Sequence, residues 1–232
     1  MGILQKLRST SRELGVLSGS IYVLSRALKK ISPESGIFFY DWTVQPITEN
    51  RILPEKRASR YTHRIIVGDD PLFKEMPVLP ELIEHRIRQQ VECLALFKDD
   101  ALVGFIWFAF GSYVEDEVRI NFLLEPQTQS VFDFNLYIFP KYRLGYAFAA
   151  IWDVANRYLY RHGVRYTYSR ITHIKRNSLA SHNRLGASII GWSITIKITR
   201  FELTLTRNPF NVFWSVDDRK RLDVTMSPGM RS

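Results

Sequence analysis

The chain has 232 residues, of which 46% are hydrophobic and 13% aromatic. This content is sufficient for a full-sized core in one or two domains and argues against extensive disorder. The 32 Lys and Arg residues exceed the 23 Asp and Glu residues by 9. Such an excess favours polyanionic partners such as a nucleotide, a nucleic acid or an acidic membrane surface, and charge alone does not choose among them.

The single cysteine, Cys93, lies in an apolar run, where a small buried side chain is the simplest interpretation. A chain with one cysteine forms no internal disulfide, which fits a reducing compartment. The amino terminus lacks the unbroken apolar core of a secretory signal because Arg8, Arg12 and Glu13 interrupt it. Since no stretch reaches the ~18 apolar residues of a transmembrane helix, we expect a cytoplasmic protein, with peripheral binding to the inner membrane as an option.

Residues 3 to 31 carry apolar side chains at helical spacing, which predicts an amphipathic helix or a pair of helices. Six basic residues and one acidic residue give this segment a net charge of +5, more than half of the charge of the chain. A basic amphipathic stretch can lie on an anionic membrane. It can equally pack its apolar face on the rest of the protein, and the pattern leaves both open.

Later segments alternate between strand and helix patterns. Residues 37–44 read as a strand and 48–60 as a polar connector. The pattern then predicts strands at 61–67, 93–97 and 102–110, with a helix at 80–91. Lys98 to Ala101 form a short polar turn typical of an antiparallel hairpin. The remaining predicted elements are a strand at 132–139, a helix at 146–161, a strand at 165–172, a short helix at 178–185 and an antiparallel pair at 190–199 and 200–206. A meander followed by strand, helix, strand and helix predicts a mixed α/β fold (α+β).

The most informative segment is Leu136 to Phe148, where a strand runs through a turn into a helix. In such a turn small residues let consecutive amides point toward one anion, and the helix start adds unpaired N–H groups. Gly145 is expected to supply backbone freedom, and Ala147 avoids crowding a phosphate. A loop with one glycine is weak evidence by itself, because many α/β proteins use such a turn only for packing.

Pro140-x-Tyr142-Arg143 followed by Gly145-x-Ala147 resembles the acyl-CoA-binding loop of the GNAT superfamily of N-acetyltransferases. The loop is one residue shorter than the usual pattern and lacks its first glycine. The resemblance implies a bacterial-type, acyl-CoA-dependent N-acyltransferase with a mixed, mostly antiparallel central sheet flanked by helices. It also implies that the donor is bound by Tyr137, Ile138, Phe139, Lys141, Tyr142, Arg143, Leu144, Gly145, Tyr146, Ala147 and Phe148.

A second segment, Ser178 to Ala187, resembles the late helix of the superfamily with its leucine-glycine ending. The family usually has asparagine where this chain has Lys175. Where this chain has His182 the family has a tyrosine that protonates the departing thiolate. The resemblance implies that Lys175 and Ser178 contact the donor and that His182 is the acid, since histidine donates protons at neutral pH. A histidine on the helix surface is the alternative, and Ser178 is also a natural helix N-cap.

The resemblance further implies direct attack of an amine on the thioester, with no nucleophilic side chain. A kinked strand would turn a backbone N–H of Tyr137, Ile138 or Phe139 toward the thioester carbonyl. Asp133, at the start of that strand, is the first candidate for the base, and Glu117 in the acidic run 115–117 is the second. A charged run is also the pattern of a solvated loop. No cluster has metal-ligand spacing, so we expect no metal.

The resemblance covers about residues 61–206, the expected acyltransferase domain, between an N-terminal segment (1–60) and a C-terminal tail (207–232). The predicted function is transfer of an acetyl or longer acyl group from acyl-CoA to a primary amine. The alternative is a noncatalytic GNAT-like module that binds an anionic membrane, through residues 1–31, or a nucleic acid, which is the less expected partner. Neither the acceptor nor the oligomeric state follows from the sequence.

Overall fold

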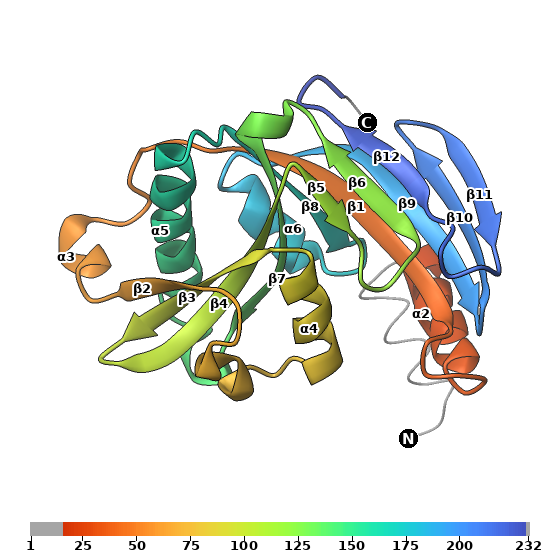
Figure 1. Ribbon diagram of the computed structural model, residues 1–232, viewed down its shortest axis with the longest axis horizontal. Helices are drawn as coiled ribbons and strands as arrows, with labels where there is room; N and C mark the ends of the chain where they lie inside the picture. Colours follow the sequence, from red (N-terminus) through yellow and green to blue (C-terminus); the bar gives the residue numbers. More distant parts are fainter. Residues whose placement is uncertain (1–15, 231–232) are drawn as a thin grey trace. The chain divides into compact units, whose positions relative to one another are not determined.

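The computed structural model describes residues 16–230 and is drawn in Figure 1. Residues 1–15, where the predicted amphipathic segment begins, lie outside the described residues. The chain divides into two compact units: unit 1 is Met1–Val44, Glu115–Asn121 and Arg170–Ser232, and unit 2 is Gln45–Val114 and Phe122–Ser169. Both units combine helices with mostly antiparallel strands, so the predicted mixed α/β class is confirmed.

Unit 2 contains the strand-loop-helix segment that the sequence analysis singled out. Its strands follow the order β8-β7-β4-β3-β2, and every neighbouring pair is antiparallel except β7 and β8, which are parallel. The strands are β2 Thr62–Ile66, β3 Glu92–Lys98, β4 Ala101–Phe110, β5 Ser112–Val114, β6 Ile120–Leu124, β7 Ser130–Ile138 and β8 Tyr166–Thr172. The helices are α3 Glu55–Ala58, α4 Pro80–Arg88 and α5 Ala147–Arg161, with short 3-10 turns at Pro71–Glu75, Gln127–Gln129 and Pro140–Tyr142. Strands β6 and β8 each have residues in both units.

The β3–β4 hairpin is the part of unit 2 that the sequence predicted best. Its turn residues Asp99 and Asp100 have φ angles of 51° and 59°, as a two-residue hairpin turn requires and as aspartate tolerates. Leu94, Ala95 and Leu96 of β3 are completely buried, because both faces of these central strands are covered. Helix α5 packs against β3 and β4, and Figure 1 shows it standing against these strands.

Aromatic side chains fill the core between α4 and the strands. Trp107 of β4 stacks on Phe73 and on Phe134 of β7, with ring centroids 5.3 and 6.2 Å apart. The buried guanidinium of Arg86 from α4 lies 5.0 Å from both the Trp107 and the Phe134 ring centroids. The predicted helix at 80–91 therefore exists, but its buried face includes a cation as well as Ile83.

Gly104 is required where β4 pairs with the end of β7, near the candidate loop. A Cβ atom added to Gly104 would meet the backbone oxygen of Tyr137 and would lie 2.7 Å from Ile138 Cδ1. We expect Gly104→Ala to push the two strands apart and to lower the free energy of unfolding by about 1–3 kcal/mol. Chemical denaturation measures this loss, and Gly229→Ala is the matched control because a Cβ there meets nothing within 4 Å. Equal stability of the two variants would contradict the close packing.

Unit 1 holds the remaining elements, with strand order β11-β10-β9-β1 and antiparallel pairing throughout. They are α2 Val16–Leu28, β1 Gly36–Pro46, α6 Arg176–Asn183, β9 Ser188–Ile198, β10 Phe201–Arg207, β11 Asn211–Ser215 and β12 Leu222–Met226. Strand β1 continues into unit 2 at Gln45. Helix α2 agrees with part of the predicted amphipathic segment. Strands β11 and β12 occupy a region where the sequence predicted only a tail.

One smaller expectation, the burial of the single cysteine, is confirmed by the structure. Cys93 is completely buried, and burial raises the pKa of its thiol, which fits the structural interpretation. Within residues 16–230, no helix has both the length and the apolar character needed to cross a membrane.

Candidate functional site

Strand β7 leaves its parallel neighbour before it reaches the loop. The residues of unit 2 paired across β7 and β8 are Ser130–Phe132 and Tyr166–Tyr168, whereas β7 continues to Ile138. We call the point after Phe132 the fork. Beyond it the β4–β7 register shifts, so that Asn135 and Leu136 lie opposite the single residue Ile106. Asn135 has a φ of 48°, and a bulge of this kind bends the strand that carries it.

The bulge determines which backbone amide points away from β4. The Phe139 N–H donates to the Val103 carbonyl at 3.0 Å, so the backbone N–H of Phe139 points toward β4. Residues of an antiparallel strand alternate between pointing at the partner and pointing away, which directs Tyr137 toward β4 and Ile138 away from it. The carbonyl of Ile138 accepts a 2.8 Å hydrogen bond from Arg143 Nε. Of the three predicted donors, Ile138 is therefore the one whose N–H points away from β4.

The loop after β7 ends at a helix start without a side-chain cap. Within the loop the N–H of Tyr142 donates to Phe139 and that of Gly145 donates to Tyr142. Helix α5 begins at Ala147, its N-cap Tyr146 makes no side-chain capping bond, and the first helical bond runs from Ala150 to Tyr146 at 2.8 Å. The N–H groups of residues 147–149 therefore have no acceptor within the helix, which is the arrangement that binds phosphate groups.

Cations lie on the loop and beside the N-cap residue of this helix. Lys141 Nζ lies 4.7 Å from the Tyr142 ring centroid, and the Arg143 guanidinium lies 5.4 Å from that of Tyr137. Both basic side chains belong to exposed residues. The structure adds Arg57 of α3, whose guanidinium lies 4.3 Å from the Tyr146 ring centroid. Arg57 does not stand out in the sequence, because residues 48–60 read as a polar connector.

The connector is fixed to α5 by a buried carboxylate. Asp153 Oδ1 accepts the N–H groups of Ile52 and Leu53 at 2.7 and 3.2 Å, and Arg157 bonds the other carboxylate oxygen at 2.9 Å. This anchor holds the chain that leads to α3 and so to Arg57.

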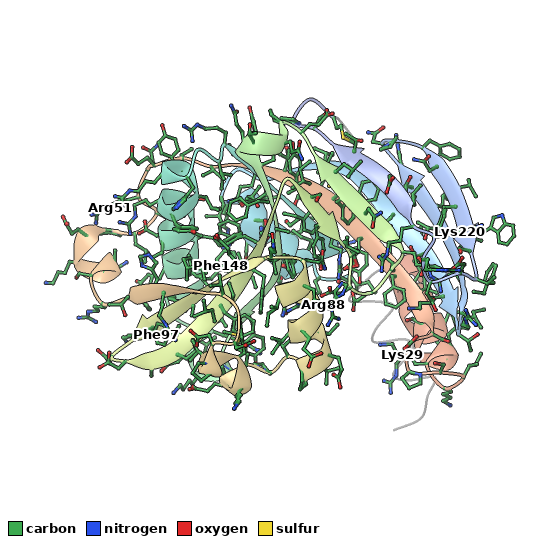
Figure 2. All side chains as sticks on the ribbon, in the orientation of Figure 1. Lys29, Arg51, Arg88, Phe97, Phe148 and Lys220 are labelled. Atoms are coloured by element: carbon green, nitrogen blue, oxygen red, sulfur yellow. The ribbon has the colours of Figure 1, made fainter. Side chains whose placement is uncertain are left out.

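Other loop residues differ in exposure, and the role expected of Gly145 is corrected. Leu144 is fully exposed, and Tyr146 is 48% exposed. Phe148, labelled in Figure 2, is half-buried in the first turn of α5. Gly145 does not have the left-handed φ that would require glycine, and a Cβ there would meet only Tyr142 O at an ordinary 3.6 Å. The glycine keeps this position small and open, rather than supplying unusual backbone freedom.

Asp133, the first candidate for the base, is the first residue of β7 after the fork. It is buried and accepts a 2.6 Å hydrogen bond from the Thr167 hydroxyl. Burial raises the pKa of Asp133 to about 7, although the hydroxyls of Thr167 and Ser169 oppose the rise. A carboxylate with a pKa near neutrality is well matched to accept a proton from an amine.

Glu117, the second candidate, lies in unit 1 and is already engaged. Arg170 Nη2 contacts Glu117 at 2.9 Å and the completely buried Glu115 at 2.5 Å. The Tyr40 hydroxyl donates to Glu117 at 2.5 Å. Burial raises the pKa of Glu117, but Arg170 and Tyr40 outweigh this and lower it overall. A lowered pKa makes Glu117 a weaker base than Asp133.

The late-helix residues also lie in unit 1. Lys175 is the exposed N-cap residue of α6 and makes no side-chain capping bond. Ser178 is the third residue of the helix, and its N–H donates to the Lys175 carbonyl at 2.9 Å. The prediction that Ser178 is the N-cap is therefore wrong, because the helix begins two residues earlier than the pattern indicated. His182 is buried, and burial lowers its pKa to about 4.

A histidine with this pKa is neutral at pH 7, so an imidazolium is available in only about one molecule in a thousand. We expect His182→Phe to keep kcat within about threefold at saturating substrates, since the protonated form is too rare to be the main acid. Steady-state kinetics of the purified variant measures this. A ten- to hundredfold loss of kcat with unchanged donor affinity, partly recovered in His182→Tyr, would instead restore the acid role.

An oriented histidine that the sequence analysis missed lies elsewhere in unit 1. His173 Nδ1 lies 2.9 Å from Asp41 Oδ2, and its ring stacks on Phe39 with centroids 4.0 Å apart. Because a carboxylate only accepts, Nδ1 carries the hydrogen, and in the neutral ring this leaves Nε2 as the acceptor. The His173 side chain is 36% exposed, so it is a third candidate for a base. Asp41 and His173 are 132 residues apart in the sequence, so no local motif indicates the pair.

Comparisons with known proteins find only distant structural similarities. No family model and no curated protein matches the sequence. Three similar solved structures are a functionally unknown conserved protein from Staphylococcus epidermidis, a protein assigned to the GNAT acetyltransferase family from Novosphingobium aromaticivorans, and a tandem GNAT protein from the clavulanic acid biosynthesis pathway. Their identities to this chain are 10%, 11% and 13%, and the TM-scores are 0.46, 0.44 and 0.47.

These similarities are too low to show what this chain does. They cover 73%, 66% and 75% of this chain but only 64%, 60% and 55% of the three proteins, less than two thirds of their length. The description of the fold given above, with its strand order and the fork of β7, does not depend on these similar structures. Among residues 16–230, no group of three or more His, Cys, Asp or Glu side chains is placed to hold a metal ion.

Proposed function

We propose that the chain is an N-acyltransferase that moves an acyl group from acyl-CoA to a primary amine. The observation that supports this best is the continuous path in unit 2 from the fork of β7, through the bulge, to the uncapped start of α5. Such a path offers a strand edge for the pantetheine arm and helical N–H groups for the pyrophosphate. The donor itself supplies an activated thioester.

Each residue of the path has one task in this proposal. The N–H groups of residues 147–149 and the cations Arg57, Lys141 and Arg143 hold the pyrophosphate. The Ile138 N–H stabilises the negative charge that develops on the thioester oxygen. Asp133 takes the proton released when the amine nitrogen bonds to the acyl carbon and the C–S bond breaks. The thiolate, with a pKa near 8.5, leaves without strong assistance.

Acetyl is the donor group we propose first, with a longer acyl chain as the variant to test. The proposed location is the cytoplasm, and residues 1–31 remain the proposed contact with the inner membrane. The domain boundaries at residues 60 and 206 also stay a prediction, which limited proteolysis followed by mass spectrometry tests directly.

Titration calorimetry with acetyl-CoA tests the proposal at its first step. We expect saturable binding of acetyl-CoA and of CoA. Pantetheine should bind much more weakly, because it lacks the pyrophosphate. A donor panel with pooled amines, followed by thiol release, then tests transfer. Absence of binding at millimolar acetyl-CoA would overturn the proposal.

The alternative function is a noncatalytic GNAT-like module, favoured by Lys175 and His182 at positions where the family has asparagine and tyrosine. A module of this kind would bind anionic vesicles or DNA in a salt-sensitive way without binding the donor. The same purified chain distinguishes the two functions, since donor affinity and polyanion affinity are measured independently.

A further inference from the structure

The sheet of unit 1 buries its polar face. Residues on alternate positions of three adjacent strands are at most 4% exposed, and they are Ser193 and Thr195 of β9, Glu202, Thr204 and Thr206 of β10, and Ser215 of β11. The hydroxyl oxygens of Thr195 and Thr204 lie 2.9 Å apart, and Glu202 accepts the Arg119 N–H at 2.6 Å. Thr206 and Ser215 also donate to backbone carbonyls of unit 1, so this buried face has hydrogen-bond partners within the unit and the opposite face is left to be explained.

The opposite face of the same strands is apolar, because side chains alternate along a strand. Leu203 pairs with Ile196 on one side and Trp214 on the other, and Leu205 pairs with Ile194 and Val212. Cross-strand partners share a face. We call the continuous surface formed by Ile194, Ile196, Leu203, Leu205, Val212 and Trp214 the apolar face.

Exposure of the apolar face increases toward the edge of the sheet. Its residues on β9 and β10 are half-buried, whereas Val212 and Trp214 on the edge strand β11 are 61% and 67% exposed. Phe210 and Val216 extend the stripe and are 75% and 53% exposed. Soluble proteins seldom leave four large apolar side chains so open within one strand and its two flanking residues, and such a patch marks an interaction surface.

Cations lie at the rim of this face. Arg200 precedes β10 and Arg207 ends it, directly opposite Trp192 on the apolar side. Both are exposed, as are Arg219 and Lys220 after β11. Lys220 is labelled in Figure 2, near the blue strands of unit 1.

Two aspartates neutralise part of this rim. Asp217 pairs with Arg219 at 3.4 Å, and Asp218 lies 3.9 Å from Arg200. Arg207 and Lys220 add positive charge beyond these pairs.

We propose that the apolar face of unit 1 docks on an anionic lipid surface, with Phe210 and Trp214 entering the interfacial layer. Aromatic side chains concentrate at the boundary between headgroups and acyl chains, and arginine and lysine beside them pair with anionic headgroups. A second copy of the chain fits less well, because a self-complementary contact would bring two cationic rims together. This surface is separate from the proposed donor site in unit 2 and does not depend on acyl transfer.

Tryptophan fluorescence of the full chain tests the proposal. Trp42, Trp107 and Trp152 are completely buried, whereas Trp214 is 67% exposed. Vesicles of phosphatidylcholine with about 30% phosphatidylglycerol should therefore shift the emission to the blue and protect it from acrylamide, while pure phosphatidylcholine should do so weakly. Co-sedimentation with the same vesicles measures the partition coefficient.

The double variant Phe210→Ser, Trp214→Ser should lower that coefficient at least about tenfold, because it removes the aromatic groups that enter the interface. Val67→Ser is the matched control, since Val67 is 58% exposed in unit 2, and it should bind like the parent. Equal vesicle binding by the double variant, or no binding by the parent, overturns the proposal. Concentration-dependent dimers in sedimentation velocity that the double variant abolishes would assign the face to a second copy instead.

Discussion

Gly145→Glu is expected to weaken acetyl-CoA binding by at least about a hundredfold while the protein stays folded. The new side chain would start from an open position, because a Cβ at residue 145 meets only Tyr142 O at 3.6 Å. A carboxylate two residues before Ala147 can accept hydrogen bonds from N–H groups at the start of α5. It would therefore occupy the proposed pyrophosphate site and repel the donor.

The folded state should tolerate this change or gain slightly from it. An acidic group at a helix N-terminus is favourable, and the first turn of α5 contains none. Calorimetry gives the donor affinity, and a thermal melt confirms the fold. Gly145→Ala should bind like the parent, and Gly145→Gln, which has the size without the charge, should fall between the two. An unchanged affinity in folded Gly145→Glu would remove the proposed pyrophosphate site.

The fold could be predicted where local chemistry determines it. The hairpin turn at Asp99-Asp100 and the strand pair β9 and β10 are each indicated by residues close together in the sequence, and the structure confirms both predictions. Strand β12 was missed because its neighbour β6 lies about a hundred residues earlier in the chain. Strand β11 pairs with the preceding β10, but it was missed because it carries its apolar side chains on the open face. An exposed stripe at Val212 and Trp214 has the spacing of a strand but no burial to explain it.

The candidate site could be predicted only along one stretch of chain. The loop Pro140 to Ala147 is contiguous, so its motif is visible in the sequence. Arg57 and the Asp41–His173 pair come from distant segments, and only the folded chain brings each beside its partner. For His182 of α6 the motif indicated the right helix but not the protonation state. Burial in the folded chain lowers the pKa of His182, and the sequence does not show this burial.

Asp133→Asn is expected to lower kcat/KM by about a hundredfold or more, the effect typical of losing a general base. In the parent, kcat/KM should rise as the pH increases to about 7 and then level off, because the active carboxylate is the deprotonated form and its pKa lies there. This rising limb of the pH profile should disappear in Asp133→Asn. Thr167→Val removes the hydrogen bond that lowers the pKa of Asp133, so it should move the limb to higher pH. A limb that survives in Asp133→Asn but is lost in His173→Gln would assign the base to His173.

Stability gives a second reading that needs no acceptor. The pKa of Asp133 is about 7 in the folded chain, whereas an unfolded aspartate titrates near 3.9. The folded state therefore binds more protons than the unfolded state between these values, and linkage requires the free energy of unfolding to fall as the pH rises through this window. Stability contributed by protonated Asp133 is fully present below about pH 4 and lost above about pH 7. Asparagine cannot titrate, so the difference between parent and Asp133→Asn, measured by urea denaturation from about pH 4 to 8, should follow this curve. A constant difference across that range would show that Asp133 is ionised throughout, and it would leave the neutral-pH limb of the activity profile to another group.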